Sequence, residues 1–470
     1  MEVLDKGWLY LKHTPTILTE FENYLEQNDM LLAQFAECSG VHQRTLSNWV
    51  NQLRPISVHQ LDRISEAMGL PEGYFYDVYI ENYIIDHPPN MRRIEPLLYR
   101  CAELDKLDSV RRILGQIIDN TLYSPRLFGI AETLFAQGRH AAALLIYENV
   151  AEVEKYQHSE RLALCQYRIF TIKIGDNQSQ NLRIATVFEV YVERLDEIDQ
   201  LDALKDLANV YRSLRKWDKV DELARRMRAK AEIQNSLQHQ RKRRTRENEK
   251  KTKGPLFGYI AYADLLCASV CEAHGDYQRA LQYTYSYADL DWVKETDEET
   301  RHWIELFQQW AEGNIMVNKL LSGDINVLQD YAEYIATSKV DIEMVTKLLN
   351  VMLAANRFQL DVTHILKRFE SEINLLTQQG QSSSDMYTKQ VIPEQFARLG
   401  YELAYYYLHR GNYNDGFKQL MYAMAAYHIL NNETYYINCI GLFEHFRAHA
   451  APDTIAEYLN LIEKVWLNNV

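Results

Sequence analysis

The sequence predicts an all-α protein in which a compact bundle of short helices is followed by a long array of helical hairpins. Apolar side chains recur at helical spacing in nearly every segment, and the alternation of Val, Ile and Thr that is typical of strands is absent. Only 18 glycines and 10 prolines occur among 470 residues, too few for the many tight turns of a sandwich or barrel. A pattern of one turn and one aromatic residue repeats through most of the chain, which indicates stacked hairpins.

The N-terminal region, residues 1–80, is expected to hold four or five short helices. The helix Ile17–Gln27 is followed by Leu31–Cys38, then by a glycine turn and a third helix at His42–Val50. A proline breaks the chain next, and a serine that can cap a helix begins the fourth, Val58–Met68. Short helices joined by one sharp glycine turn predict a DNA-binding type of bundle.

The segment FAECSGVHQRTLSNWV carries the strongest local signal, that of a helix-turn-helix. Ala36 is small where the two helices cross, Gly40 makes the turn, and Val41 and Leu46 anchor the second helix in the core. Gln and Asn suit adenine edges and Arg suits guanine in the major groove. The predicted DNA contacts are His42, Gln43, Arg44, Ser47, Asn48 and Arg54.

The charge of this region leaves two interpretations open. Residues 1–80 hold five Lys and Arg residues against eleven Asp and Glu residues, and the second helix starts with the apolar Met30-Leu31-Leu32. The bundle either binds a duplex DNA operator, for which it needs a homodimer to gain affinity, or serves only for dimerisation or docking.

The second region, residues 85–470, repeats one pattern. A small residue lies mid-helix, a glycine or polar turn residue follows seven positions later, then an aromatic residue and a second small residue. The best copies run from Ala131 to Ala143, from Ala208 to Val220, from Ala268 to Ala280 and from Ala404 to Gly416, with weaker copies at Gly323 and Phe358. This spacing predicts a right-handed α-solenoid of six or seven degenerate tetratricopeptide repeats, with residues 434–469 as a cap.

Two segments interrupt the array. Residues 239–253 hold eight basic residues against two acids, which predicts a solvated helix extension or loop, with a nucleic-acid patch as the alternative. Residues 378–385 are expected to form a flexible loop.

The first helices of the hairpins are expected to line a concave groove. A Lys, an Asn and an Arg that share one helical face can hold the carboxylate and backbone amides of a short peptide. The residues at these positions are Lys205, Asn209, Arg212 and Asn350, with Tyr401 and Tyr405 as an apolar wall. An ordinary solvated helix face explains the same residues equally well.

No catalytic or cofactor site is expected. Cys267, Cys271 and His274 share one helix, but structural zinc needs four ligands, and the two cysteines flank the packing residue Ala268. The sequence contains no phosphate-binding glycine loop, nucleophile elbow or paired-histidine metal motif. We therefore expect core cysteines, no metal, no cofactor and no enzymatic activity.

The overall charge and the distribution of apolar residues limit where in the cell the protein is expected to act. A net charge of −14 excludes a general binder of polyanions. The longest apolar stretches, such as Ala141–Tyr147, are far shorter than the roughly 20 residues of a membrane span. With six cysteines and no apolar leader at the N-terminus, the sequence predicts a cytoplasmic protein without membrane contact.

A helix-turn-helix of the Cro/CI type followed by a degenerate tetratricopeptide array resembles the peptide-pheromone receptors of Gram-positive bacteria, the Rap/Rgg/NprR/PlcR/PrgX (RRNPP) group. The resemblance implies a quorum-sensing regulator that binds a short signalling peptide in the groove, dimerises through the array and changes its binding of DNA. It also implies that Asn209 holds the peptide backbone. The acidic first region and the basic insertion depart from that group. A protein-sequestering adaptor, and more remotely a Rap-like phosphatase activity, remain as alternatives.

Overall fold

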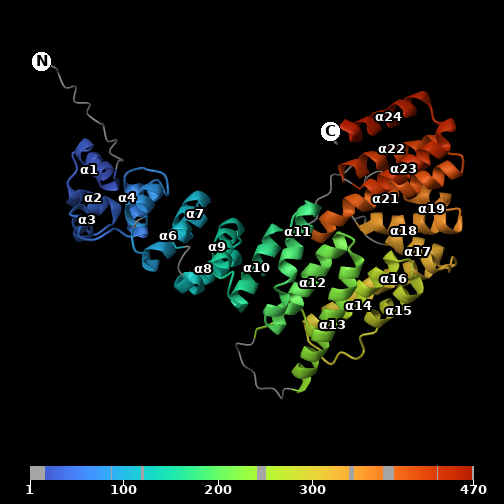
Figure 1. Ribbon diagram of the computed structural model, residues 1–470, viewed down its shortest axis with the longest axis horizontal. Helices are drawn as coiled ribbons and strands as arrows, with labels where there is room; N and C mark the ends of the chain where they lie inside the picture. Colours follow the sequence, from blue (N-terminus) through green and yellow to red (C-terminus); the bar gives the residue numbers. More distant parts are fainter. Residues whose placement is uncertain are drawn as a thin grey trace. The chain divides into compact units, whose positions relative to one another are not determined.

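The computed structural model describes residues 16–85, 87–117, 121–240, 250–337, 343–373, 386–430 and 432–467. The regular structure in these ranges is helical throughout, which confirms the predicted all-α class. The chain forms two compact units, Met1–Lys173 and Ile174–Val470, called unit 1 and unit 2 below (Figure 1). The N-terminal stretch 1–15 and the predicted loop 378–385 lie outside the described residues.

Unit 1 begins with the predicted bundle. Its helices are α1 (Ile17–Gln27), α2 (Leu32–Ser39), α3 (Gln43–Val50), α4 (Val58–Ala67) and α5 (Tyr76–Tyr83). The bounds expected for the first four agree within one residue, and polar side chains cap the starts of α1, α3 and α4. Thr16 accepts a hydrogen bond from Thr19 N at 3.2 Å, and Ser57 forms a capping box with Gln60.

Unit 1 continues beyond the bundle. The further elements are α6 (Met91–Glu103), α7 (Leu107–Gly115), η1 (Thr121–Tyr123), α8 (Ser124–Ala136), α9 (His140–Val153) and α10 (Glu160–Lys173). Helix α6 packs against α4, so the bundle and the helices after it share one unit. Residue 80, the expected end of the first domain, falls inside α5, and the compact unit ends at Lys173.

Aromatic rings form the centre of the bundle. The Phe21 ring lies 4.9 Å from Phe35 and 5.2 Å from Trp49, centroid to centroid. All three side chains, and Leu46 on α3, are buried. Burying a side chain of this size stabilises the fold by roughly 1.5–3 kcal/mol, so these contacts hold α1, α2 and α3 together.

Unit 2 is a succession of packed helices. Its elements are α11 (Gln178–Glu189), η2 (Val192–Arg194), α12 (Glu197–Ser213), α13 (Trp217–Gln240), α14 (Leu256–Ala273), α15 (Tyr277–Ala288), α16 (Glu298–Ser322), α17 (Val327–Thr337), α18 (Glu343–Phe358), α19 (Thr363–Arg368), α21 (Met386–His409), α22 (Tyr413–Ile429), α23 (Glu433–Phe446), η3 (Arg447–His449) and α24 (Pro452–Leu467). From α12 to α18, each helix contacts its neighbours along the chain, and α12, α14, α16 and α18 also contact one another in sequence. Contacts between neighbours and next neighbours are those expected of a helical solenoid.

The repeated sequence pattern coincides with the turns between paired helices. Between α8 and α9, Gly138 takes the left-handed conformation with φ +76°, and Ala131 and Ala143 on either side are buried. The turn residues of three further pairs in unit 2 also have positive φ: Arg215 (+55°), Gly275 (+77°) and Gly411 (+77°). Small residues flank each turn, so the helices of a pair approach closely.

Among the described residues, α14 is the one helix that is long and apolar enough to cross a membrane. Its 18 residues satisfy the length and composition of a membrane span, but 67% of that window is buried inside the protein. It packs against α13 and α15 as a core helix.

A glycine on α22 sets the distance between α21 and α22. A Cβ on Gly416 would lie 2.7 Å from Leu408 Cγ and 3.1 Å from its backbone nitrogen. The Gly416→Ala variant is therefore expected to lower the free energy of unfolding by about 1–2 kcal/mol, through overpacking that the backbone of α21 cannot relieve. Urea denaturation would measure the change.

Gly441 on α23 is the matched control, because a Cβ there has no neighbour within 4 Å. Gly441→Ala is expected to be neutral or stabilising by about 0.5–1 kcal/mol, the helix-propensity difference alone. Equal effects at both glycines would contradict this account of the α21–α22 contact.

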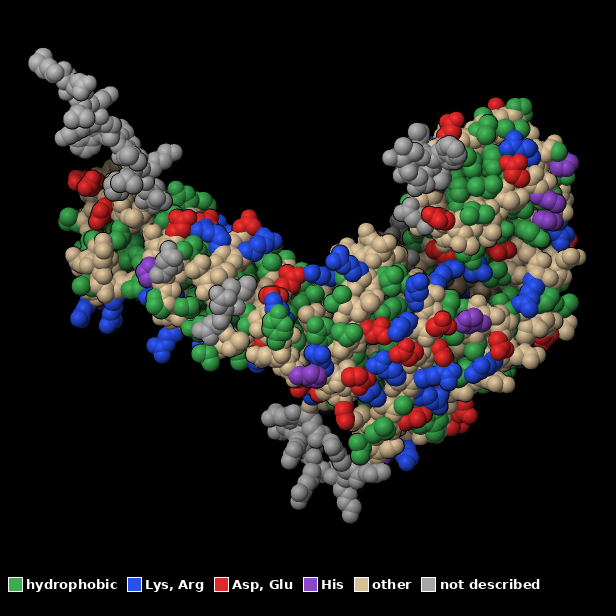
Figure 2. Space-filling model, in the orientation of Figure 1, with side chains coloured by type: hydrophobic (Ala, Val, Ile, Leu, Met, Phe, Trp, Pro, Cys, Tyr) green, Lys and Arg blue, Asp and Glu red, His purple; other side chains and the backbone are tan. Residues whose placement is uncertain are grey.

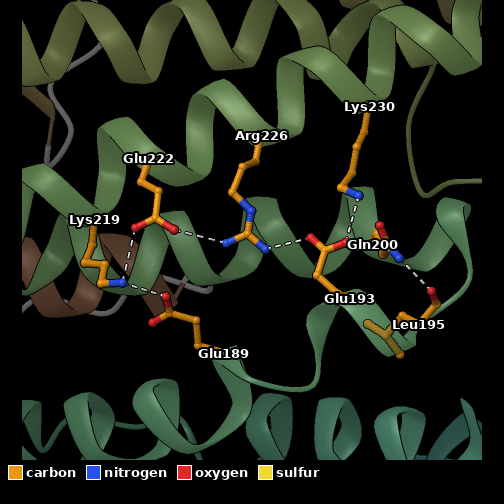
Figure 3. A network of polar contacts seen from close by, with 8 residues as sticks. All are labelled: Glu189, Glu193, Leu195, Gln200, Lys219, Glu222, Arg226 and Lys230. Carbon is orange, nitrogen blue, oxygen red and sulfur yellow. Dashed lines mark hydrogen bonds and ion pairs between the residues drawn. The ribbon is translucent and has the colours of Figure 1, made fainter. Parts of the chain in front are cut away.

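Ion pairs tie α13 to the end of α11 and to η2 (Figure 3). Lys219 donates to Glu189 at 2.7 Å, while Arg226 and Lys230 donate to Glu193 at 2.7 and 3.0 Å. The hydrogen bond from Arg226 lowers the pKa of Glu193, and Lys230 adds to the shift. Stability from a lowered carboxyl pKa is present at neutral pH and is lost as the pH falls through that value.

Candidate nucleic-acid interface and ligand surface

The turn between α2 and α3 positions the second helix of the helix-turn-helix. Gly40 ends α2 in the left-handed backbone conformation with φ +63°, which residues other than glycine rarely adopt. Arg63 on α4 donates a hydrogen bond to the Gly40 carbonyl at 2.8 Å. Because Leu46 and Trp49 are buried, the opposite face of α3 points outward.

The predicted base contacts gather on that outer face. Gln43 and Arg44, in the first turn of α3, are exposed, and Ser47 and Asn48 are half-buried. His42 is the N-cap and not part of the helix: its Nδ1 accepts a hydrogen bond from Arg44 N at 3.1 Å. The exposed imidazole of His42 caps the start of α3, whereas the other four predicted contacts, Gln43, Arg44, Ser47 and Asn48, lie within the helix.

The loop after α3 holds the sixth predicted contact. The exposed Arg54 donates its backbone N–H to the Asn48 carbonyl at 3.3 Å. Tyr79 on α5 donates to the Ile56 carbonyl at 2.8 Å and fixes the end of the loop. Arg54 therefore lies at the C-terminal end of α3, where a phosphate contact is geometrically possible.

Residues 21–75 match the helix-turn-helix family model HTH_3. The matched range includes all six predicted DNA contacts. No curated protein matches the chain. Unit 1 thus carries a DNA-binding helix-turn-helix of the Cro/CI type, which supports a role in the regulation of transcription.

Arginines from beyond residue 80 neutralise part of the bundle's acidity. Arg100 on α6 pairs with two acids of the bundle, Asp62 at 3.1 Å and Glu72 at 3.2 Å. Arg112 on α7 pairs with two others, Asp77 at 3.3 Å and Glu81 at 3.0 Å. The charge count of residues 1–80 alone missed these pairs. Their members lie 28 to 38 positions apart, and no local pattern marks them.

In unit 2, the three predicted ligand residues of α12 share one half-exposed face. Tyr262 on α14 donates its hydroxyl to Asn209 Oδ1 at 2.6 Å, and Lys205 Nζ lies 5.6 Å from the centroid of the Tyr259 ring. The positive charge of Arg212 opposes the upward shift that burial gives to the pKa of Glu272. Two aromatic side chains of α14, Tyr262 and Tyr259, thus orient Asn209 and Lys205.

The other predicted ligand residues lie on α18 and α21. Asn350 is half-exposed and bonds to Tyr331, Tyr401 is half-buried with its pKa raised by burial to about 12, and Tyr405 stacks on His409 at 4.0 Å. Helix α21 packs against both α12 and α18. The helices that carry all six residues are therefore joined through α21.

Unpaired polar atoms lie inside unit 2. Asn318 is fully buried and donates to Glu272 Oε1 at 2.9 Å, while its own carbonyl oxygen has no partner among the described residues. On α21, Glu394 forms an ion pair with Arg215, yet its Oε1 and the Nε of Arg398 are buried and unpaired within the described chain. Each such atom costs about 1–3 kcal/mol until a water or ligand satisfies it.

The described end of the basic run pairs with acidic residues of α12 and with its N-cap. Lys250 forms ion pairs with Asp196 and Asp199, and Lys253 Nζ lies 3.4 Å from Asp206. Helix α13 extends into the run as far as Gln240, and residues 241–249 lie outside the described residues. Intramolecular ion pairs, rather than a free basic patch, explain these two lysines.

Cys267 and Cys271 are buried on α14, as expected for core cysteines. His274 donates its Nδ1–H to the Val270 carbonyl at 2.8 Å. This local contact fits a helix end.

Proposed function

We propose that the protein is a peptide-responsive transcriptional regulator of the cytoplasm, without enzymatic activity. Residues 1–80 bind a duplex DNA operator, and residues 85–470 form a tetratricopeptide-like array that binds a short signalling peptide and dimerises. This is the quorum-sensing activity of the RRNPP group, which the sequence resembles.

The exposed face of α3 is the observation that carries the DNA-binding part. Gln43 and Arg44 are exposed at the start of a helix whose opposite face is fixed in the core. Side chains of these types, on the second helix of a helix-turn-helix, contact base edges in the major groove.

The peptide-binding part is supported by the polar interior of unit 2. Lys205, Asn209 and Arg212 share the half-exposed face of α12, and α12 contacts α21, where Glu394 and Arg398 have unpaired buried atoms. An extended peptide offers one N–H and one C=O at each residue, which amides and charged side chains can satisfy.

A selection of genomic fragments by the purified full-length protein tests the proposal. At moderate salt, we expect enrichment of a two-fold symmetric site, because two half-sites are needed for useful affinity. Light scattering is expected to show a homodimer at micromolar concentration. A monomer that binds no fragment more tightly than random DNA, with or without a library of short peptides, would favour the protein-sequestering adaptor.

A further inference from the structure

Five exposed arginines form no ion pair among the described residues of unit 1: Arg44, Arg54, Arg63, Arg92 and Arg139. Arg100, Arg112 and Arg126, in contrast, are paired with carboxylates. Of the five, Arg44 on α3 and Arg54 in the following loop belong to the DNA-contacting face already described, and Arg92 on α6 lies outside the range matched by the family model.

One residue joins the start of α6 to the end of α3. Trp49 Nε1 donates to the Tyr83 hydroxyl at 3.2 Å, and Arg93 Nη1 donates to the Tyr83 carbonyl at 3.3 Å. Arg93 of α6 thus contacts Tyr83, which in turn contacts Trp49 of α3. Arg92 precedes it in the first turn, where the Asn90 side chain accepts its backbone N–H at 3.0 Å.

The charged side chains are unevenly distributed over unit 1. Figure 2 shows Lys and Arg side chains on the edge that carries α3 and α6, while Asp and Glu side chains alternate with Lys and Arg on the opposite edge. Four of the bundle's acids are held by Arg100 and Arg112. The Lys and Arg side chains seen on this edge of unit 1 therefore extend from α3 to α6.

We infer that Arg92 of α6 contacts the phosphate backbone of the DNA bound by α3, and so extends the interface beyond the helix-turn-helix. The inference rests on the proposed function. A duplex carries one negative charge per about 1.7 Å of its axis, so a cation beside the reading helix meets a phosphate without needing a particular base. Arg92 adds affinity that the acidic bundle otherwise lacks.

Salt-titrated binding of the full-length Arg92→Ala variant tests this contact. Each phosphate contact contributes a slope of about −0.9 to log K against log salt, so the slope is expected to become shallower by about 1. At 0.15 M salt the same relation gives a loss of about fivefold, equal for cognate and random duplexes. Arg92→Lys keeps the charge and is expected to retain most of the wild-type slope.

Arg139→Ala is the matched control, because Arg139 is also exposed in unit 1 and lies at the turn before α9. Its salt slope is expected to equal that of the wild type. If Arg92→Ala binds with unchanged affinity and slope while the wild type binds specifically, the contact is overturned and the proposed function stands. If the wild type binds no DNA specifically, both are overturned.

Discussion

Replacing Gln43 and Arg44 together by alanine is expected to remove most of the preference of the protein for its cognate site. Both side chains are exposed in the first turn of α3, the part of such a helix that meets base edges. Each good bidentate contact contributes about 1–3 kcal/mol of discrimination, so the double variant is expected to lose roughly 2–6 kcal/mol on the cognate site. Binding to random duplex falls far less, because only one charge is lost.

Competition binding with cognate and random duplexes at fixed salt measures this difference. The fold should persist, because Leu46 and Trp49 anchor α3 and neither substituted side chain is buried. Arg111→Ala is a suitable control: Arg111 is an exposed arginine of α7 already paired with Asp108. A double variant that loses affinity equally for both duplexes would show that α3 contacts only the backbone.

The helices of the bundle were predictable because their signals are local. Thr16, Ser57 and Gly40 act within a few residues of the helix ends that they fix, and the apolar residues of α3 follow the helical period. The division into units was not predictable in the same way. The α4–α6 contact and the ion pairs of Arg100 depend on side chains distant in sequence, so a change of pattern near residue 80 did not mark the edge of a compact unit.

In unit 2, the sequence pattern located the helix turns but not the partners of the ligand residues. The spacing placed Lys205, Asn209 and Arg212 on one helical face, which the structure bears out. It gave no indication that Tyr262 would bond to Asn209, because that contact joins residues 53 positions apart on α12 and α14.

Replacing Asn209 by alanine is expected to weaken binding of the cognate peptide by about 1–3 kcal/mol, the loss that follows when a desolvated polar partner is left unpaired. The Tyr262 hydroxyl fixes the Asn209 carbonyl oxygen at 2.6 Å, which orients the side-chain amide before any ligand arrives. An amide held in place in this way loses little conformational entropy on binding. Calorimetry with a peptide selected from a library measures the effect.

The Asn209→Asp variant distinguishes the hydrogen-bond acceptor of this amide from its donor. The carboxylate keeps the shape of the side chain and still accepts the Tyr262 hydrogen bond, but it cannot donate to a peptide carbonyl. If donation from the amide holds the peptide, Asn209→Asp should weaken binding at least as much as Asn209→Ala. Asn438→Ala, at an exposed asparagine of α23, should leave the affinity unchanged. Unaltered affinity in both Asn209 variants, and also in Lys205→Ala and Arg212→Ala, would place the peptide on another helix of unit 2.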